Sequence, residues 1–532
     1  MLIDTDTMRM TLSGRSNVKV FASRPSSIKE FFQHTVSRFG NKEALFMDNK
    51  RLTYSELDEA SDRLMASLQN QYQIEKGDRI AVFLGNSLEF PIIVLACIKS
   101  GAIMVPVNTK LKAAEVSYIL CHSKPKVLIY DHELWSILEE CKEKDEAVNP
   151  YIISLVSVGG PSSRGGTLAS LLGEKQKMKD VEIAETDPAF ILYTSGTTGR
   201  PKGAVISHIN VVHTVMHYEH SFEATDEIRT ILAVPIFHVT GLVARFLLIL
   251  YLGGSMVIMK KYQNEAYIKK CYNFKANFVS NVPTIFVMMA TSPLLKEYSF
   301  DFVKIVGFGG SPIYQQTLEK LREIFPNATY RNVYGATETS SPTTIMPASY
   351  PMTKATSVGK PVETADIKIV NVDDQELGIN QVGELLIKGP MVIGEYWDNP
   401  EANRTSFVDG YWRSGDIGKI DEDGFVYILD RKKDMINRGG EKIFSIEVED
   451  VLKKHPEIIE AAIVAVPDVM YGERVKAFIV SDTLKVEDQD AIRAYCSQFL
   501  AKFKVPELFE FPDELPKTAS GKVLKQLLKQ PK

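Results

Sequence analysis

The sequence predicts an α/β protein: a large N-terminal domain of stacked α/β sheets with a β subdomain, followed by a small α+β C-terminal lid. Strand-like apolar runs alternate with amphipathic helix-like stretches through the first three-quarters of the chain, a pattern typical of mostly parallel sheets. Residues 354–429 are instead rich in short strands and in Gly and Asp turns. The charged segment 430–434 then precedes a last region, 435–532. A chain of 532 residues is also long enough for about three domains.

The elements of residues 1–429 follow from hydrophobic periodicity. We expect strands at 79–84, 102–107, 126–130, 189–193 and 230–234, and helices at 54–71, 204–220 and 317–324. The apolar stretch 241–259 is interrupted by Arg245 and by Gly253-Gly254. It therefore predicts a buried helix followed by a buried strand, not a transmembrane segment.

The later elements are shorter. We expect strands of the β subdomain (354–429) at 367–370 and 383–389, and elements of the C-terminal lid at 446–455 (helix), 463–466 and 477–480 (strands) and 490–502 (helix). The charged residues 430–434 are expected to form the hinge between the N-terminal domain, 1–429, and the lid, 435–532.

Composition excludes some classes of function. The 62 basic and 67 acidic residues nearly cancel, which argues against a nucleic-acid partner. The five cysteines are scattered and include no Cys-x-x-Cys pair, so we expect free thiols in a reducing, cytoplasmic compartment. Asp4 and Asp6 occur early and no apolar core follows them, so no signal peptide is expected. Peripheral membrane contact and the oligomeric state stay open.

The most informative motif is Tyr193-Thr-Ser-Gly-Thr-Thr-Gly-Arg-Pro-Lys-Gly203, which packs four hydroxyls, three glycines and one lysine into eleven residues. Glycines bring backbone N–H groups close to an anion, hydroxyls add donors, and Lys202 adds a positive charge. A strand before it and a helix after it would be the usual setting of a phosphate loop. The spacing is not that of a Walker A loop, and a surface turn is the alternative reading.

Further motifs contain residues suited to a nucleotide site. They are Gly307-Phe-Gly-Gly-Ser-Pro312, Asn332-Val-Tyr-Gly-Ala-Thr-Glu338, Tyr411-Trp-Arg-Ser-Gly-Asp416, Asp430-Arg-Lys-Lys-Asp434 and Pro516-Lys-Thr-Ala-Ser-Gly-Lys522. Tyr334 can stack on a base, Glu338 can bind Mg²⁺ between phosphates, and Asp416 can accept both ribose hydroxyls. Each motif alone is more simply a turn, a strand end or a charged surface segment.

Together, these motifs closely resemble the adenylate-forming superfamily, which includes acyl- and aryl-CoA synthetases, peptide-synthetase adenylation domains and firefly luciferase. Their order and separations match over roughly residues 25–525. The resemblance implies β/γ-phosphate binding by Thr194, Ser195, Gly196, Thr197, Thr198, Gly199 and Lys202. It implies adenine binding by Gly310, Ser311 and Tyr334, with Gly335 as a further nucleotide-site residue. It implies an α-phosphate contact for Thr337, a metal contact for Glu338, ribose contacts for Asp416 and Arg431, a hinge at Lys433 and an adenylation lysine at Lys522. Ser311 and Ser414 stand where Ala and Thr are common, which are conservative departures.

The resemblance also implies a reaction in two halves. An acid and ATP, with Mg²⁺, form an acyl-adenylate, and a thiol, most simply that of coenzyme A, then displaces AMP. The mobile lid would rotate about Lys433 between the halves, withdrawing Lys522 and bringing Gly439, Gly440 and Lys442 towards the thiol channel. Loading of a separate acyl-carrier protein and a catalytically silent nucleotide-binding relative are the alternatives.

The identity of the acid is less well defined by the sequence. His238 stands where amino-acid adenylation domains usually place an Asp, which disfavours an amino-acid substrate. His238 either gates the acyl tunnel or is a packed imidazole. Predicted pocket walls are small or aliphatic: Val239, Leu242, Val282, Gly307 and Gly309. They favour a medium- to long-chain fatty acid, with an aryl acid as the alternative.

Overall fold

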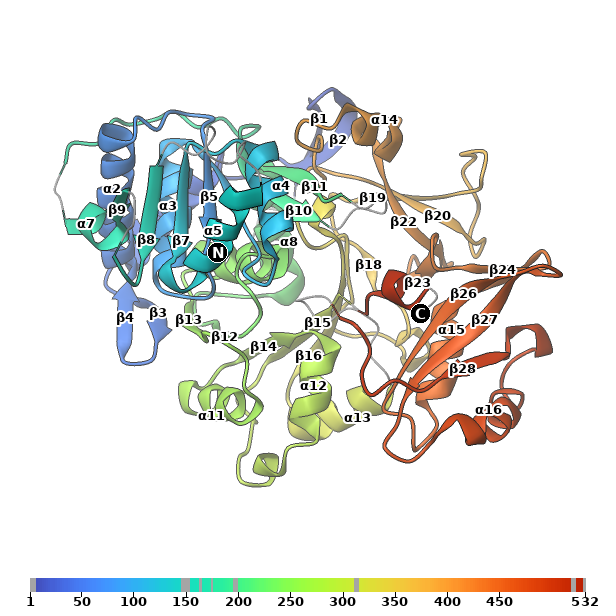
Figure 1. Ribbon diagram of the computed structural model, residues 1–532. Coiled ribbons are helices and arrows are strands. Elements are labelled where there is room, and N and C mark those ends of the chain that lie inside the picture. Colours follow the sequence, from blue (N-terminus) through green and yellow to red (C-terminus); the bar gives the residue numbers. More distant parts are fainter. Residues whose placement is uncertain are drawn as a thin grey trace.

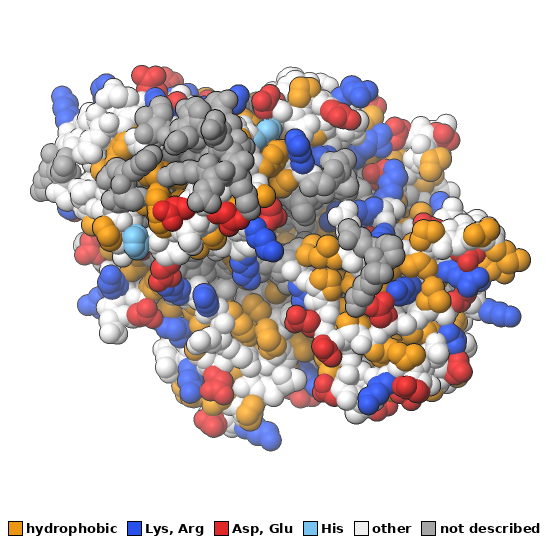
Figure 2. Space-filling model, viewed as in Figure 1, with side chains coloured by type: hydrophobic (Ala, Val, Ile, Leu, Met, Phe, Trp, Pro, Cys, Tyr) orange, Lys and Arg blue, Asp and Glu red, His pale blue; other side chains and the backbone are white. Residues whose placement is uncertain are grey.

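The computed structural model describes residues 6–144, 154–161, 165–173, 176–194, 200–310, 315–517 and 523–529. Figure 1 shows a large N-terminal part, coloured blue to yellow, and a smaller orange and red part beside it. Figure 2 shows Lys and Arg mixed with Asp and Glu over the face in view, as expected from the near balance of charges. Apolar side chains gather at its right-hand end, where the β26–β27 hairpin turns and Val469 and Met470 are exposed.

The first large sheet has the strand order β11-β10-β6-β5-β7-β8-β9. Its strands are β5 (Arg79–Phe83), β6 (Ile103–Pro106), β7 (Val127–Asp131), β8 (Ser154–Val158), β9 (Gly165–Thr167), β10 (Pro188–Thr194) and β11 (Lys202–Ser207). Its pairs are parallel except for β10 with β11. After Arg79, the first residue of β5, the central strands β5 and β6 are apolar because both faces of the sheet are covered. The described helices of this region are α2 (Tyr54–Gln71), α3 (Glu89–Ser100), α4 (Ala113–Ser123), α5 (Trp135–Lys144) and α7 (Leu168–Gly173).

Helix α2 illustrates how the sequence defines an element. Thr53 Oγ1 accepts a hydrogen bond from the Glu56 backbone N–H, and the Thr53 N–H donates to Glu56 Oε2 at 2.8 Å, which forms a capping box. Leu57, Leu64 and Leu68 recur at helical spacing and are fully buried. The cap contributes about 1 kcal/mol and the apolar stripe docks the helix. The helix predicted over 54–71 is confirmed.

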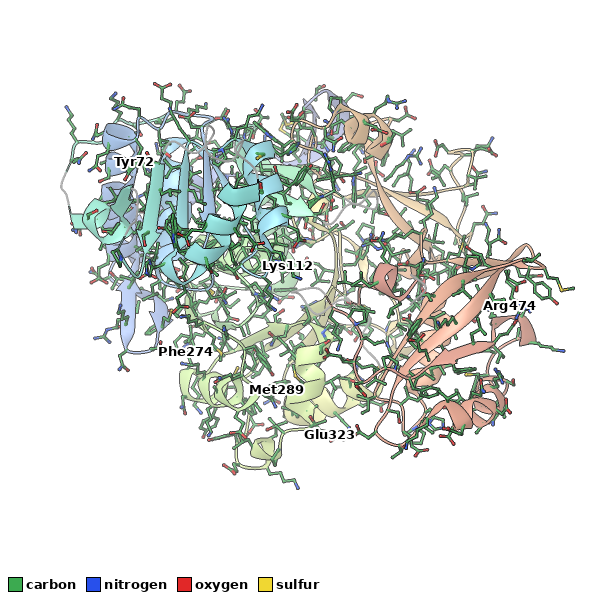
Figure 3. The ribbon with its side chains drawn as sticks, viewed as in Figure 1. Tyr72, Lys112, Phe274, Met289, Glu323 and Arg474 are labelled. Carbon is green, nitrogen blue, oxygen red and sulfur yellow. The ribbon has the colours of Figure 1, made fainter. Side chains whose placement is uncertain are left out.

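The second large sheet has the order β18-β17-β16-β15-β14-β12-β13-β3-β4, and β14, β15 and β16 are parallel. Its strands are β3 (Glu43–Met47), β4 (Lys50–Thr53), β12 (Arg229–Leu232), β13 (Ser255–Ile258), β14 (Phe278–Asn281), β15 (Ile305–Gly309), β16 (Thr329–Tyr334), β17 (Thr344–Ile345) and β18 (Lys360–Pro361). Helices α11 (Asn264–Phe274), α12 (Pro283–Ala290) and α13 (Gln315–Ile324) pack on one face, where Phe274 and Met289 are labelled in Figure 3.

A layer of helices separates the two large sheets and forms the main core. Its members include α1 (Ile28–Phe39), α8 (His208–Phe222) and α10 (Leu248–Leu252). Their apolar side chains join those of both sheets in one buried cluster.

The prediction of a helix over 204–220 was wrong in its first turn. Residues Lys202–Ser207 form β11, antiparallel to β10, and α8 begins only at His208. Val205 and Ile206 are β-branched and pair with Ile191 and Phe190, so the sheet edge holds this short apolar run as a strand. The described ends of the motif, Tyr193-Thr194 and Lys202-Gly203, are therefore paired antiparallel strands, and the motif is followed by a strand instead of a helix.

The apolar stretch 241–259 is a buried helix followed by a buried strand, as predicted. A π-helical turn, η2 (Leu242–Leu247), continues into α10, which ends at Gly253 with φ = +77°. β13 follows. In the part of the chain that the structure describes, no helix is both long and apolar enough to cross a membrane.

The β-rich region and the lid each have their own sheet. The first contains β19 (Asp366–Val370), β20 (Gly383–Lys388), β21 (Phe407–Val408), β22 (Tyr411–Ile420) and β23 (Val426–Arg431), with α14 (Pro400–Ser406) beside it. The lid contains β24 (Ile436–Arg438), β25 (Glu441–Ile443), β26 (Glu460–Asp468), β27 (Gly472–Val480) and β28 (Leu508–Glu510), with α15 (Ser445–Lys453), α16 (Gln489–Cys496) and α17 (Lys525–Leu528). The helix expected at 490–502 ends early, at Cys496. Arg474, labelled in Figure 3, marks the lid sheet.

The N-terminal hairpin, β1 (Thr7–Leu12) and β2 (Arg15–Phe21), is fastened to distant parts of the chain. Arg15 is 8% exposed, and its Nη2 donates to the Val392 carbonyl at 3.0 Å. The Phe21 N–H donates to His213 Nε2 and the Ile28 N–H donates to His208 Nδ1, both at 3.2 Å. Both imidazoles are buried on α8 and must be neutral to accept these bonds.

Acid pH should therefore destabilise the fold. Burial lowers the pKa of His208 to about 4 and that of His213 to about 3. The unfolded chain binds more protons between these values and about 6.5, so stability is complete above pH 6.5 and is lost as the pH falls. We expect each imidazole to remove about 1 kcal/mol between pH 7 and pH 5.5, measured as a lower urea midpoint.

The matched variants are His213→Gln, which should weaken the pH dependence, and His34→Gln, which should not, because His34 is exposed. An unfolding midpoint that stays constant from pH 7 to pH 5 would contradict this assignment.

Candidate active site

The β10–β11 hairpin presents the two ends of the glycine- and hydroxyl-rich loop. Thr194 pairs directly with Lys202 across the antiparallel strands. The two residues therefore sit side by side at the base of the loop. Ser195, Gly196, Thr197, Thr198 and Gly199 lie outside the described residues, as do Ser311 and Lys522.

Glu338 lies next to this hairpin, on the short 3₁₀ turn η4 (Thr337–Thr339) that follows β16. Its Oε1 accepts hydrogen bonds from Thr194 Oγ1 at 3.2 Å and from the Tyr396 hydroxyl at 3.1 Å. The Glu338 carbonyl accepts from the Ile393 N–H at 2.9 Å. Neutral donors from two distant segments therefore orient the carboxylate.

Tyr396 connects several parts of this cluster. Its hydroxyl accepts a hydrogen bond from Trp412 Nε1 at 3.2 Å and donates to Glu338. The Lys202 ammonium lies 5.3 Å from the centre of its ring, within cation–π range. Burial and the neighbouring Glu338 raise the pKa of Tyr396, so the hydroxyl stays protonated and keeps donating.

Asp416 is the centre of a second group. Its Oδ2 accepts from the Tyr334 hydroxyl at 2.5 Å, and its Oδ1 lies 2.7 Å from Arg431 Nε. Asp416 and Arg431 are direct partners across β22 and β23, and Tyr334 ends β16 in the second large sheet. Burial and the Asp416 carboxylate raise the pKa of Tyr334. The residues expected at ribose and adenine are thus in mutual contact.

The turn between these two groups requires glycine. A Cβ on Gly335 would lie 1.4 Å from the Ser341 carbonyl oxygen. Ser340 and Ser341 have φ of +53° and +124°, in a region that side chains other than glycine rarely adopt. Thr339 Oγ1 holds the turn by accepting from the Ala336 N–H at 2.9 Å. This close fit fixes Thr337 and Glu338 relative to Tyr334.

The predicted acyl-pocket residues lie at the end of β15 and at the start of the helical segment that follows β12. His238 precedes α9 (Val239–Gly241), and its ring meets Phe237 edge-on at 4.8 Å between centroids. Leu242 is fully buried, whereas His238 and Val239 are partly exposed. A Cβ on Gly309 would lie 2.2 Å from the Val333 carbonyl oxygen. Gly310 has φ = +83°.

The predicted hinge, residues 430–434, is anchored on both sides. The Asp430 carboxylate is 1% exposed and accepts from the Arg431 N–H at 2.8 Å and from Ser445 Oγ at 2.9 Å, at the start of α15. Burial raises the pKa of Asp430 to about 6. The Lys433 carbonyl accepts from Lys529 Nζ at 3.0 Å. Lys517 and Val523 form a β-bridge that closes the base of the loop containing Lys522.

The structure does not bring the predicted thiol-channel residues to the nucleotide cluster. Gly439 and Gly440 form the turn of the β24–β25 hairpin, with φ of +60° and +93°, and Lys442 follows on β25. The Gly439 N–H donates to the Tyr471 carbonyl at 2.7 Å, a contact within the lid. Their predicted role therefore requires the lid to move.

Sequence reasoning missed Tyr396 and Trp412 as site residues. Trp412 is part of the motif Tyr411–Asp416, in which only Asp416 was assigned a role. Tyr396 lies outside all the motifs named above. Tyr396 is important because it contacts Glu338, 58 positions away, and Trp412 because it donates to the Tyr396 hydroxyl.

The cluster fits a magnesium ion held mainly by phosphates. Mg²⁺ is commonly bound through one or two carboxylates together with substrate phosphates and waters. Glu338 provides one carboxylate, oriented by hydroxyls. Within the described ranges, no group of three or more His, Cys, Asp and Glu residues could form an all-protein metal site.

Comparison with known proteins agrees with this geometry. Residues 32–397 match the AMP-binding enzyme family, and residues 447–522 match the AMP-binding enzyme C-terminal domain. The chain belongs to the AMP-binding enzyme family. The resemblance and the fold class drawn from the sequence are confirmed.

Curated relatives and solved structures cover nearly the whole chain. The long-chain-fatty-acid–CoA ligase of Haemophilus influenzae is 31% identical over 541 residues, 95% of both chains. Long-chain-fatty-acid–CoA ligase FadD13 of Mycobacterium tuberculosis is 31% identical and covers 90% of this chain and 93% of its own. The o-succinylbenzoate CoA synthetase of Bacillus subtilis with its acyl-adenylate intermediate is 29% identical, with a TM-score of 0.82, covering 94% of this chain and 98% of that one. The same synthetase with ATP and magnesium is also similar, with a TM-score of 0.81, 29% identity and coverage of 94% and 99%.

Tyr396→Phe tests the positioning of Glu338. Removing the hydroxyl leaves Trp412 and Glu338 without their shared partner, so we expect the apparent Mg²⁺ affinity in ATP-dependent pyrophosphate release to fall by roughly 10-fold. Tyr427→Phe is the control, because the Tyr427 hydroxyl donates to Asp421 in the β-rich region. An unchanged Mg²⁺ titration for Tyr396→Phe would show that the tyrosine only packs.

Proposed function

We propose that this protein is an ATP-dependent carboxylic acid–CoA ligase that works through an acyl-adenylate. The observation that carries the proposal is the convergence of Thr194, Lys202 and Glu338 with the Tyr334–Asp416–Arg431 group where three sheets meet. Curated relatives that match over nearly the full length are named as CoA ligases. Solved relatives hold ATP with magnesium or an acyl-adenylate.

In the first half-reaction the acid carboxylate attacks the α-phosphorus of ATP, and pyrophosphate leaves. Lys202 and the backbone of its loop would stabilise the β/γ-phosphates, and Thr337 would contact the α-phosphate. Mg²⁺ at Glu338 would neutralise phosphate charge. Asp416 and Arg431 would hold the ribose, which places the α-phosphorus near Glu338. Lys522 would stabilise charge on the reacting phosphoryl group.

In the second half-reaction the CoA thiol attacks the acyl carbon, and AMP leaves. Rotation about Lys433 would exchange the Lys522 loop for the Gly439–Gly440 turn. The positive φ of both glycines and the open space beside Gly440 support a path for pantetheine close to the backbone. Lys442 would lie beside this path. These roles, and the domain limits that define the lid, are part of the proposal.

The acid is best explained as a medium- to long-chain fatty acid. The pocket walls predicted at Val239, Leu242 and Gly309 are aliphatic or lack a side chain, and the two curated relatives above are named for long-chain fatty acids. An aryl acid is the second candidate, since the solved o-succinylbenzoate CoA synthetase shares this fold.

The proposal also includes the acyl acceptor and the cellular compartment. We take free CoA as acceptor, with an acyl-carrier protein as the alternative. The five cysteines are free thiols in the structure, which supports a reducing, cytoplasmic location. Retention of Lys202, Glu338, Asp416 and Lys522 argues against a catalytically silent relative.

Lys522→Ala should abolish most adenylation. Loss of one preorganised positive charge at a developing anion costs about 10²–10³ in rate, measured as acid-dependent pyrophosphate release. Lys517→Ala is the control, because Lys517 pairs with Glu460 at the base of the same loop. Release that requires a fatty acid and rises with CoA supports the ligase. Indifference to CoA would indicate a carrier protein, and no release with any acid would refute the proposal.

Lys433→Pro should separate the half-reactions. Proline fixes φ near −65° and restricts the preceding residue, so the lid would be held in one orientation. We expect one half-reaction to fall at least roughly 10-fold while the other stays near the wild-type rate. Pyrophosphate release measures the first half-reaction, and thioester formation from added acyl-adenylate measures the second. Wild-type rates for both would exclude the rotation.

A further inference from the structure

Arg245 is a buried cation in an otherwise apolar helix. It lies in the π-helical turn η2, is 6% exposed, and follows Leu242 by three positions. Leu242 and Val239 are predicted walls of the acyl pocket. Arg245 follows Val239 by six positions, more than one helical turn further along the same helical run. It is thus placed near the far end of a medium-length acyl chain.

The guanidinium has fewer partners than it can bind. Its Nη1 donates to the Ala244 carbonyl at 2.7 Å, its Nη2 donates to Ser280 Oγ, and its carbon lies 5.0 Å from the centre of the Phe278 ring. Among the described residues, Nε has no hydrogen-bond partner, and the ionisable groups that act on the Arg245 guanidinium are the Tyr218 and Tyr267 hydroxyls, with no carboxylate among them. Arg carries five N–H donors, so an edge of the fork is left for another acceptor.

The partners of Arg245 belong to the layer that forms the pocket. Ser280 pairs with Gly307 across β14 and β15, and a Cβ on Gly307 would lie 2.6 Å from Ser280 Oγ. Gly307 is itself a predicted pocket wall. Tyr218, which interacts electrostatically with Arg245, hydrogen-bonds with Ser341 Oγ at 2.7 Å, in the turn that fits against Gly335. Ser280 and Tyr218 thus connect Arg245 to a predicted pocket wall and to the turn beside Gly335.

An unpaired buried charge is costly, and this chain shows the usual solution elsewhere. Lys99 is 4% exposed and lies 2.6 Å from both Asp58 and Asp62. Arg245 is buried to a similar degree, and it remains charged because a guanidinium does not deprotonate at neutral pH. A carboxylate bound by the fork would supply both the missing charge and the missing acceptors.

We propose that Arg245 binds a second carboxylate at the far end of the acid substrate, so that the preferred acids are medium-chain α,ω-dicarboxylates or similar acids with a distal anion. The inference rests on the ligase function proposed above and narrows its substrate class. The reacting carboxyl lies at the nucleotide and the distal one at Arg245, with the aliphatic chain between them against Val239 and Leu242. A monocarboxylic acid of equal length leaves the guanidinium unpaired.

The test compares matched acids: octanoate with suberate and decanoate with sebacate, in acid-dependent pyrophosphate release. In the wild type, we expect kcat/KM for the diacid to exceed that for the monoacid by about tenfold or more. Arg245→Met removes the fork at similar volume, and should lower kcat/KM for the diacid by about 100-fold while leaving the monoacid equal or improved.

Arg229→Met is the matched control. Arg229 is exposed and its guanidinium lies 4.4 Å from the centre of the Phe274 ring, so the same chemical change occurs outside the pocket. It should leave both acids unchanged. If Arg245→Met does not fold, Arg245→Lys keeps the charge but loses the fork, and the diacid alone should fall by about tenfold. Calorimetric titration of sebacate and decanoate into the wild type provides a readout without turnover, with tighter binding of sebacate expected.

The inference would be overturned if the wild type prefers the monoacid and Arg245→Met does not change the ratio of kcat/KM between diacid and monoacid. Arg245 would then be a structural residue, and the ligase function would stand. Absence of pyrophosphate release with every acid would instead refute the ligase function and this inference with it.

Discussion

The buried Asp416 carboxylate connects the parts of the site. Tyr334 reaches it from the second large sheet, and Arg431 reaches it from the neighbouring strand of the β-rich sheet. Removing one partner of a buried charge pair typically costs about 3–5 kcal/mol; the cost here is smaller, because the Arg431 side chain is 48% exposed. The same contact fixes the end of β16, from which the tight turn at Gly335 carries Thr337 and Glu338 towards Lys202. The contacts of Asp416 therefore fix the positions of the second large sheet, the β-rich sheet and the β10–β11 hairpin relative to one another.

Much of the fold follows from local sequence, and the exceptions have physical causes. The helix at 54–71 was predicted to the residue because a capping box and an apolar stripe agree. The segment at 204–207 was misassigned because a short apolar run suits a helix or a strand equally, and pairing with β10 decides between them. The hairpin β1–β2 was not predicted, since its anchors on α8 and at Val392 are far away in the sequence.

Site residues that belong to sequence motifs were predicted. Residues whose role depends only on contacts in the folded chain were missed. Tyr334, Glu338, Asp416 and Arg431 were named from their motifs, and the structure brings them together. Tyr396 has no motif of its own, because its role arises only when β11 and η4 are adjacent. The sequence shows Arg245 interrupting an apolar stretch, but its burial and its contact with Ser280 require the fold.

The hydrogen bond from Arg15 to Val392 joins residues 377 positions apart, and the next residue, Ile393, holds the Glu338 backbone. During synthesis the hairpin can contact His213 once α8 exists, but its Arg15 anchor waits for most of the chain before Val392 is made. Contacts of such long sequence separation form late and slowly. The Arg15–Val392 contact therefore forms late, although β1 and β2 are the first strands to be made. Because Ile393 binds the Glu338 backbone, the Glu338 region is complete only when most of the N-terminal domain has folded.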